Sequence, residues 1–362
     1  MVIEGGIILF ALECMAMYED EVIFPDRKSN EIYSYNFETG EVRLCWKIKN
    51  EKDNITNLFG GIIPFENCLY LYPMAGKAIY KIHGKSIQRI DIKNDQLCHQ
   101  GDRAKFVSAH IWKKKIYFIG AYASIIMIYD TDSEDIEYID YGIGMAENGE
   151  INARQSMMDE GKIYIPIARM NKIIVFDMKT KQVVHKQVGK KSSAYISISK
   201  YGDFFYLVPK GKGNVVWWNE RTNDYGEIEF PIDFKRAERG FSGSVTYGGY
   251  IWLFPMNAEG IWKIDVDNCL LKQCEIVPLN ISNIFASLKH KDKLLFFSNS
   301  DYKLYVVDDG GESVNTIQVS LSEVDSKDYM DRRLNSFFSV SPIIIESDVV
   351  NLKHFLRKIK RR

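Results

Sequence analysis

A short apolar strand pattern that ends on a polar residue recurs seven times along this chain of 362 residues. The polar residue is Asp or Asn in six of the seven copies. The copies end at Asn36, His83, Asp130, Asp177, Asn219, Asp265 and Asp308, so the intervals are 47, 47, 47, 42, 46 and 43 residues. A period of this length indicates a repeat architecture in which each repeat is one small structural unit.

Each repeat contains further strand patterns around this motif. A second apolar strand precedes each copy, and in five of the seven repeats it ends on proline, as at Pro166. Proline lacks the amide donor that would continue a strand ladder, so it ends the strand and begins a loop. A weaker strand lies upstream and a more polar one follows, such as 135–140. Four strands joined by short turns predict one antiparallel sheet per repeat.

Such a sheet is apolar on both faces and cannot stand alone in water. Seven sheets arranged radially cover one another face to face, as in a β-propeller. We therefore predict an all-β fold, a seven-bladed β-propeller of four-stranded antiparallel blades over residues 1–320. Residues 321–362 are expected to form a C-terminal extension, and its last segment, 348–362, is expected to be a short basic amphipathic helix. The apolar segment 5–13 is interpreted as a buried strand.

The polar residue at the end of each motif has a structural explanation. A Ser, Thr or Asn follows it by three residues in six repeats, for example Ser133 after Asp130. An Asx side chain in this position accepts hydrogen bonds from the backbone amides of a tight turn. A metal-binding ring of carboxylates is the competing interpretation, but these turns are expected to lie far apart at the outside of the blades.

The first strand of each repeat carries a small residue where the inner strands crowd near the axis. Gly61, Ser108, Ser197, Gly243 and Ala286 form this column, and Glu13 and Arg154 are interpreted as the two members that break it. An ion pair between Glu13 and Arg154 across the channel is one expectation. Recognition of a ligand by these side chains is the other.

Two segments carry a family resemblance. Residues 161–180 and 249–265 resemble kelch-type propeller repeats, and the resemblance extends over about residues 11–320. Proline mostly stands where that family has a Gly-Gly pair. The resemblance implies a binding platform, with a minority of the family acting as enzymes.

Composition narrows the function classes. The formal net charge is −1, but residues 353–362 hold six Lys or Arg and no acid, so the remaining body has 41 basic against 48 acidic residues. An acidic body argues against nucleic-acid binding. The six cysteines show no CxxC spacing and fit reduced thiols in a cytoplasmic protein. No apolar run reaches the roughly 20 residues that cross a bilayer.

The loops after each second strand and those between repeats are expected to share one end of the channel. They place several cationic and aromatic side chains there, and we take the following as candidate ligand-binding residues: Arg103, Arg154, Arg169, Arg239, Tyr122 and Glu13. Guanidinium groups offer a planar fork to carboxylates, phosphates or acidic sugars. Lys210 and Lys212 add charge, while Met74 and Met256 add apolar contact. An ordinary solvated loop face is the alternative.

The chain offers few candidates for chemistry. The six histidines fall at different places in their repeats, so we predict no catalytic residues, no metal site and no cofactor. His110, in a first strand, is the one histidine that we expect near the channel, and it is interpreted as a core histidine with a partner. The leading hypothesis is a non-enzymatic binding or scaffold module for a protein or a small acidic ligand at the channel mouth. The alternative is an enzyme acting on an acidic sugar or peptide, and the basic tail leaves weak membrane-surface association open.

Overall fold

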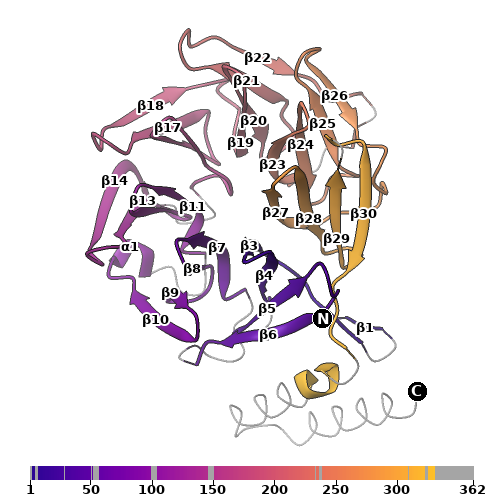
Figure 1. The fold of residues 1–362 in the computed structure, drawn as a ribbon. Helices are drawn as coiled ribbons and strands as arrows, with labels where there is room; N and C mark the ends of the chain where they lie inside the picture. The colour runs from indigo at the N-terminus through magenta and orange to yellow at the C-terminus, as the bar shows by residue number, and fades with distance from the viewer. Residues whose placement is uncertain are drawn as a thin grey trace, which may run out of the picture.

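The computed structural model describes residues 2–4, 7–27, 29–49, 51, 57–98, 104–145, 151–232, 234–235, 239–308, 310–322 and 325–330. Within them the chain forms seven four-stranded antiparallel sheets arranged in a ring, which Figure 1 shows along its axis. The predicted seven-bladed propeller is confirmed. Each blade consists of four consecutive strands, with the first strand innermost.

The first four blades have the following strands. Blade 1 contains β3 (Ala16–Tyr18), β4 (Glu21–Pro25), β5 (Glu31–Asn36) and β6 (Val42–Lys47). Blade 2 contains β7 (Phe59–Phe65), β8 (Cys68–Pro73), β9 (Ala78–His83) and β10 (Ser86–Asp91), and the short helix α1 (Asp95–Cys98) follows it. Blade 3 contains β11 (Phe106–Trp112), β12 (Lys115–Gly120), β13 (Ala123–Asp130) and β14 (Ile136–Met145). Blade 4 contains β15 (Met157–Asp159), β16 (Lys162–Pro166), β17 (Lys172–Asp177) and β18 (Val183–Gln187).

The last three blades complete the ring. Blade 5 contains β19 (Tyr195–Tyr201), β20 (Phe204–Pro209), β21 (Val215–Asn219) and β22 (Tyr225–Ile228). Blade 6 contains β23 (Phe241–Tyr247), β24 (Tyr250–Pro255), β25 (Trp262–Asp265) and β26 (Leu270–Gln273). Blade 7 contains β27 (Ile284–His290), β28 (Lys293–Ser298), β29 (Lys303–Asp308) and β30 (Ser313–Gln318).

The core consists of apolar layers between neighbouring blades, because alternate side chains of a strand point to opposite faces. In β8, Leu69 and Leu71 pack against blade 1, whereas Tyr70 and Tyr72 pack against blade 3. The same division gives one buried cluster at each of the seven blade interfaces in the described chain. This explains why the central strands read as continuous apolar runs.

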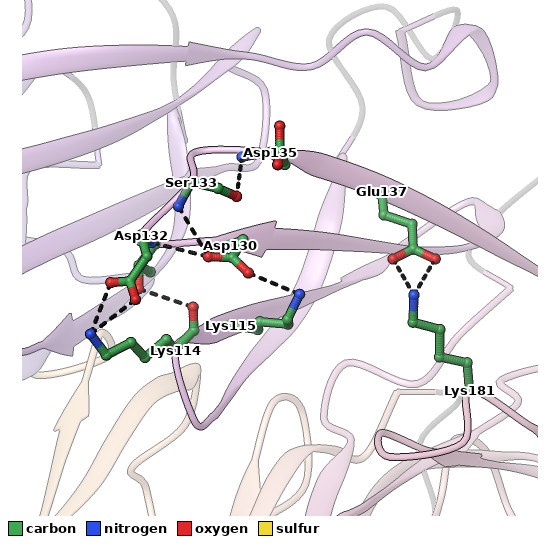
Figure 2. A network of polar contacts seen from close by, with 9 residues as sticks. Lys114, Lys115, Asp130, Asp132, Ser133, Asp135, Glu137 and Lys181 are labelled. Carbon is green, nitrogen blue, oxygen red and sulfur yellow. Dashed lines mark hydrogen bonds and ion pairs between the residues drawn. The ribbon is translucent and has the colours of Figure 1, made fainter.

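The recurring Asx residues form the predicted turns. In blade 3, Asp130 accepts hydrogen bonds from the backbone N–H groups of Asp132 and Ser133 at 3.0 and 3.2 Å, as Figure 2 shows. Lys115 Nζ lies 2.9 Å from the same carboxylate and, as the largest cause, lowers the pKa of Asp130 to about 2. Equivalent Asx bonds occur in blades 1, 4, 5 and 6. These turns are exposed or partly exposed and belong to the frame.

The amino-terminal prediction was wrong in part. Segment 5–13 does not form one strand, since β2 (Ile7–Leu9) pairs with β1 (Val2–Glu4) in a two-stranded sheet outside the ring. Leu9 also forms a bridge with Ser320, and the chain from Leu9 to Glu13 is mostly buried. Polar contacts to blade 7 take the place of a strand here.

Blades 1 and 7 close the ring through side chains. The Asn299 amide accepts from Leu12 N at 2.8 Å and donates to Leu12 O at 2.9 Å, which imitates a strand pair. A short helix at residues 325–330 adds the buried Tyr329, whose hydroxyl donates to Asp26 at 2.7 Å. The predicted helix at 348–362 lies outside the described residues.

Candidate functional site

The loops at one end of the channel form a hydrogen-bonded rim. Met74 N donates to Leu58 O at 3.0 Å, Lys105 N to Met74 O at 3.1 Å, and Ala121 N to Lys105 O at 2.9 Å. Similar backbone bonds join the loops of later blades, such as Lys210 N to Ala194 O at 2.9 Å. The two predicted sets of loops therefore do meet at one channel mouth.

A β-bulge lies near the mouth in the first strand of five blades, where the register shifts past Gly60, Val107, Ile196, Ser242 and Phe285. Each of these residues lies five positions before the end of its strand. Counting back equally from the ends of β3 and β15 gives Glu13 and Arg154. Bulge positions point differently from their neighbours because one extra residue is inserted into the ladder.

By this count, the sequence-based position of Glu13 and Arg154 in the repeat is off by one residue. Glu13 and Arg154 do not belong to the small-residue column of Gly61 and Ala286, because they fall one position earlier. Cys14 and Gln155 are the true members of that column in blades 1 and 4. The pattern alone does not show this offset, because β3 and β15 begin only after these residues.

Glu13 and Arg154 form an ion pair at the mouth, which is one of the two expectations from the sequence. Arg154 Nη2 donates to Glu13 Oε1 at 2.5 Å, and Arg27 Nε lies 3.7 Å from Glu13 Oε2. The Glu13 side chain is 4% exposed, against 23% for Arg154 and 30% for Arg27. The Phe285 ring lies against both guanidinium groups, at 4.7 Å from Arg154 and 5.5 Å from Arg27. Two partly exposed cations thus share one buried carboxylate.

A cavity of about 290 Å³ opens beside this ion pair. Its lining comes from the first strands and adjoining residues of blades 1–4, 6 and 7, and it includes Glu13, Arg154 and Phe285. Gly60 and Gly61 lie on its wall together with Tyr72. A Cβ on Gly61 would lie 2.0 Å from the Tyr72 ring, so glycine is required for that ring to take its place.

Two titratable groups on the cavity wall are held neutral. Burial raises the pKa of Tyr72, and the nearby Cys14 raises it further while Arg154 lowers it. Burial, and then the neighbouring Glu13, raises the pKa of the Cys14 thiol well above its ordinary range. A buried thiol with a raised pKa is a poor nucleophile.

A second, water-sized gap of about 10 Å³ adjoins Arg154. Arg239, Lys210 and Met256 line it together with Ile196 and Phe241. The structure therefore brings together Arg154, Arg239 and Lys210, three of the predicted cationic residues. Their shared position makes this side of the mouth basic.

The other candidates are placed elsewhere. Arg169 is exposed in the turn between β16 and β17, and Tyr122 is half-buried in the turn between β12 and β13. Neither belongs to the described lining of the two cavities. Arg103 lies outside the described residues. Sequence reasoning left Arg27, Tyr72 and Phe285 out of the candidate site, although the corrected bulge column would have found Phe285.

His110 has the partner that was expected of a core histidine. Its Nε2 lies 2.7 Å from Ser156 Oγ, in the adjacent blade, and burial lowers the pKa of His110 to about 4. The described residues contain no group of three His, Cys, Asp or Glu side chains that could hold a metal ion. No helix in this part of the chain is long and apolar enough to span a membrane.

Comparisons with known proteins support the fold. No family model and no curated protein matches the chain. Virginiamycin B lyase from Staphylococcus aureus superposes with a TM-score of 0.61 at 12% identity, covering 79% of this chain and 90% of that one. A streptogramin B lyase gives 0.60 at 12% identity, covering 87% and 95%. The computationally designed Ika8 protein gives 0.58 at 12% identity, covering 85% and 87%. At this identity the likeness shows the β-propeller fold alone.

Proposed function

We propose that this propeller is a binding module that takes a small anionic ligand at its channel mouth. The observation that carries the proposal is the charge of the ion-pair group. Arg154, in the cavity lining, and Arg27, next to Glu13, share the single carboxylate of Glu13, so the group has one net positive charge. Arg239 and Lys210 add to it from the adjoining gap. A partly water-excluded cationic site favours a negatively charged ligand.

The size of the cavity supports a small molecule. At about 290 Å³ it lies at the lower end of the range of small-molecule pockets, which is about 300–1,000 Å³. An extended peptide or a protein would have to bind across the outer loops instead. A protein ligand therefore has less support from this site than a small one.

The second hypothesis was an enzyme, and it needed Glu13, His110 and at least two arginines to converge. Glu13, Arg27 and Arg154 do converge. His110 is bonded to Ser156 and does not belong to the described lining of the cavity. Two similar folds belong to lyases, but that likeness carries no chemistry to this chain at 12% identity. Binding is therefore the function that the geometry favours.

Two further parts of this proposal rest on the sequence. The proposal that the repeats are kelch-like is supported by the resemblance of residues 161–180 and 249–265 to that repeat. A reducing compartment, the cytoplasm, is supported by the six free cysteines.

Isothermal titration calorimetry with hexanoate, glucuronate and methyl phosphate tests the proposal. Arg154→Gln is expected to lower the affinity for the most tightly bound of these anions by about tenfold or more, because it removes a charge-assisted hydrogen bond. Glu13→Gln is expected to raise the affinity for the same anion, because Arg154 loses its carboxylate partner. Arg221→Gln changes an arginine that is 78% exposed and serves as the matched control. If all four proteins bind every anion equally, or none binds, the proposal is wrong.

A further inference from the structure

Part of the cavity lining consists of apolar side chains. Met15 and Met74 line it from blades 1 and 2, and Val245 and Phe254 line it from blade 6, with Phe285 beside the arginines. Methionine side chains adapt to ligands of varied shape. A ligand that enters this cavity therefore meets apolar side chains as well as the polar groups of its lining.

Several polar groups of the lining are already paired. Gln155 donates from Nε2 to Ser244 O at 2.8 Å and accepts from Ser244 N at 2.9 Å. The Ser108 hydroxyl is bonded to Ser156 at 2.6 Å. A ligand with many hydroxyl groups would find few partners here, and unpaired polar groups bind poorly in an enclosed site.

Tyr72 is an exception among the polar groups. It is 7% exposed and lines the cavity, and its hydroxyl has no hydrogen-bond partner among the described residues. The ring is fixed by Phe118, with the two centroids 5.8 Å apart, and by the space that Gly61 leaves. This hydroxyl is therefore open to a water or a ligand that enters the cavity.

Arg154 also has donors to spare. Its guanidinium carries five N–H groups, yet its one hydrogen bond to a described residue goes to Glu13. Arg154 and Tyr72 both line this cavity, so a ligand that enters it meets both side chains.

We propose that the ligand is an amphipathic carboxylic acid, a monoanion with a short apolar body. Arg154 and Tyr72 bind the carboxylate, while Met15, Met74 and Val245 contact the hydrocarbon. The negative charge of a carboxylate complements the net positive charge of Arg27, Arg154 and Glu13. This inference rests on the proposed binding function and adds the ligand class and a specificity-determining residue, Tyr72.

Calorimetry with hexanoate, hexanamide and glucuronate tests this class. Hexanoate is expected to bind about tenfold or more tightly than hexanamide, which lacks the charge, and than glucuronate, which keeps the charge on a polar body. If glucuronate binds as tightly as hexanoate, the apolar body is wrong while anion binding stands. If no anion binds, both proposals are overturned.

The role of Tyr72 is tested separately with Tyr72→Phe. This change removes only a hydroxyl with no partner in the described structure, so the fold is expected to remain intact. Hexanoate affinity is expected to fall about tenfold. Tyr70→Phe, two residues earlier on β8 and not part of the described cavity lining, is the matched control. Equal hexanoate affinities of the wild type and Tyr72→Phe would remove Tyr72 from the site.

Discussion

At the residue scale, the carboxylate of Glu13 is what permits two arginines to lie together at the channel mouth. Its side chain is 4% exposed and is contacted by Arg154 and Arg27, while Phe285 covers both cations. Removing one member of a buried ion pair costs more than replacing both, because a charge is left without its partner.

The first prediction concerns this pair. Arg154→Gln is expected to lower the free energy of unfolding by about 2 kcal/mol, since Glu13 would keep only its longer contact to Arg27. The double variant Glu13→Gln with Arg154→Gln is expected to lose less free energy of unfolding than the two single variants lose together. Urea unfolding of the four proteins gives the coupling energy. Strict additivity would show that the pair contributes nothing to folding.

The second prediction concerns pH. His110 has a folded pKa of about 4, below its ordinary value of 6.5, so the unfolded chain takes up the proton first. Stability is therefore full above about pH 6.5 and is lost as the pH falls toward 4, by up to about 3 kcal/mol. His110→Gln keeps an acceptor for Ser156 and is expected to flatten this slope. Thermal unfolding between pH 4 and 7 measures the pH dependence of stability. Identical slopes for the wild type and His110→Gln would contradict the role of His110.

At the element scale, the Asn299 side chain makes the hydrogen bonds that link blade 7 to the chain before blade 1. It accepts from Leu12 N and donates to Leu12 O and Asn283 O, at 2.8, 2.9 and 2.8 Å. An amide supplies both a donor and an acceptor in this geometry, whereas a carboxylate supplies only acceptors.

The third prediction follows from that chemistry. Asn299→Asp preserves size but places a carboxylate against two carbonyl oxygens, and it is expected to cost about 2 kcal/mol or more. Asn315→Asp, at an exposed position in β30, is expected to change the melting temperature little. Calorimetric melting of both variants makes the comparison. Equal effects would mean that the Asn299 bonds do not hold the ring closed.

At the scale of the whole molecule, each blade is built from consecutive strands, so the ring closes without a shared strand. An apolar cluster, the Leu9–Ser320 bridge, Asn299 and Tyr329 join its two ends. The other blade interfaces have a covalent connection between their sheets. The interface between blades 1 and 7 is therefore the place where we expect the ring to open first.

The fourth prediction is a pattern of hydrogen exchange. Amides of β4 and β28, at the closure, are expected to exchange faster than those of β12 and β16. The last two strands belong to blades 3 and 4, which lie away from the closure. Asn299→Asp should speed exchange at the closure and leave blades 3 and 4 unchanged. Uniform exchange around the ring would show that it opens as one unit.

The sequence by itself determined the frame of this protein. The period, the five prolines that end β4, β8, β16, β20 and β24, and the Asx turns all depend on local rules of strand pairing and turn chemistry. Those rules act within a few residues, so they can be read without knowledge of the fold. Lys210 and Arg239 were also placed correctly at the mouth, because their loops follow from the repeat.

Only the tertiary structure decided the site. Glu13 and Arg154 lie just before β3 and β15, and closure of the ring set Arg27 and Phe285 beside them although 258 positions separate these two in the chain. The Tyr72 hydroxyl gained its place because Gly61 leaves room for its ring. Such contacts depend on the directions of side chains from blades that are far apart in the sequence. A local sequence pattern does not contain this information.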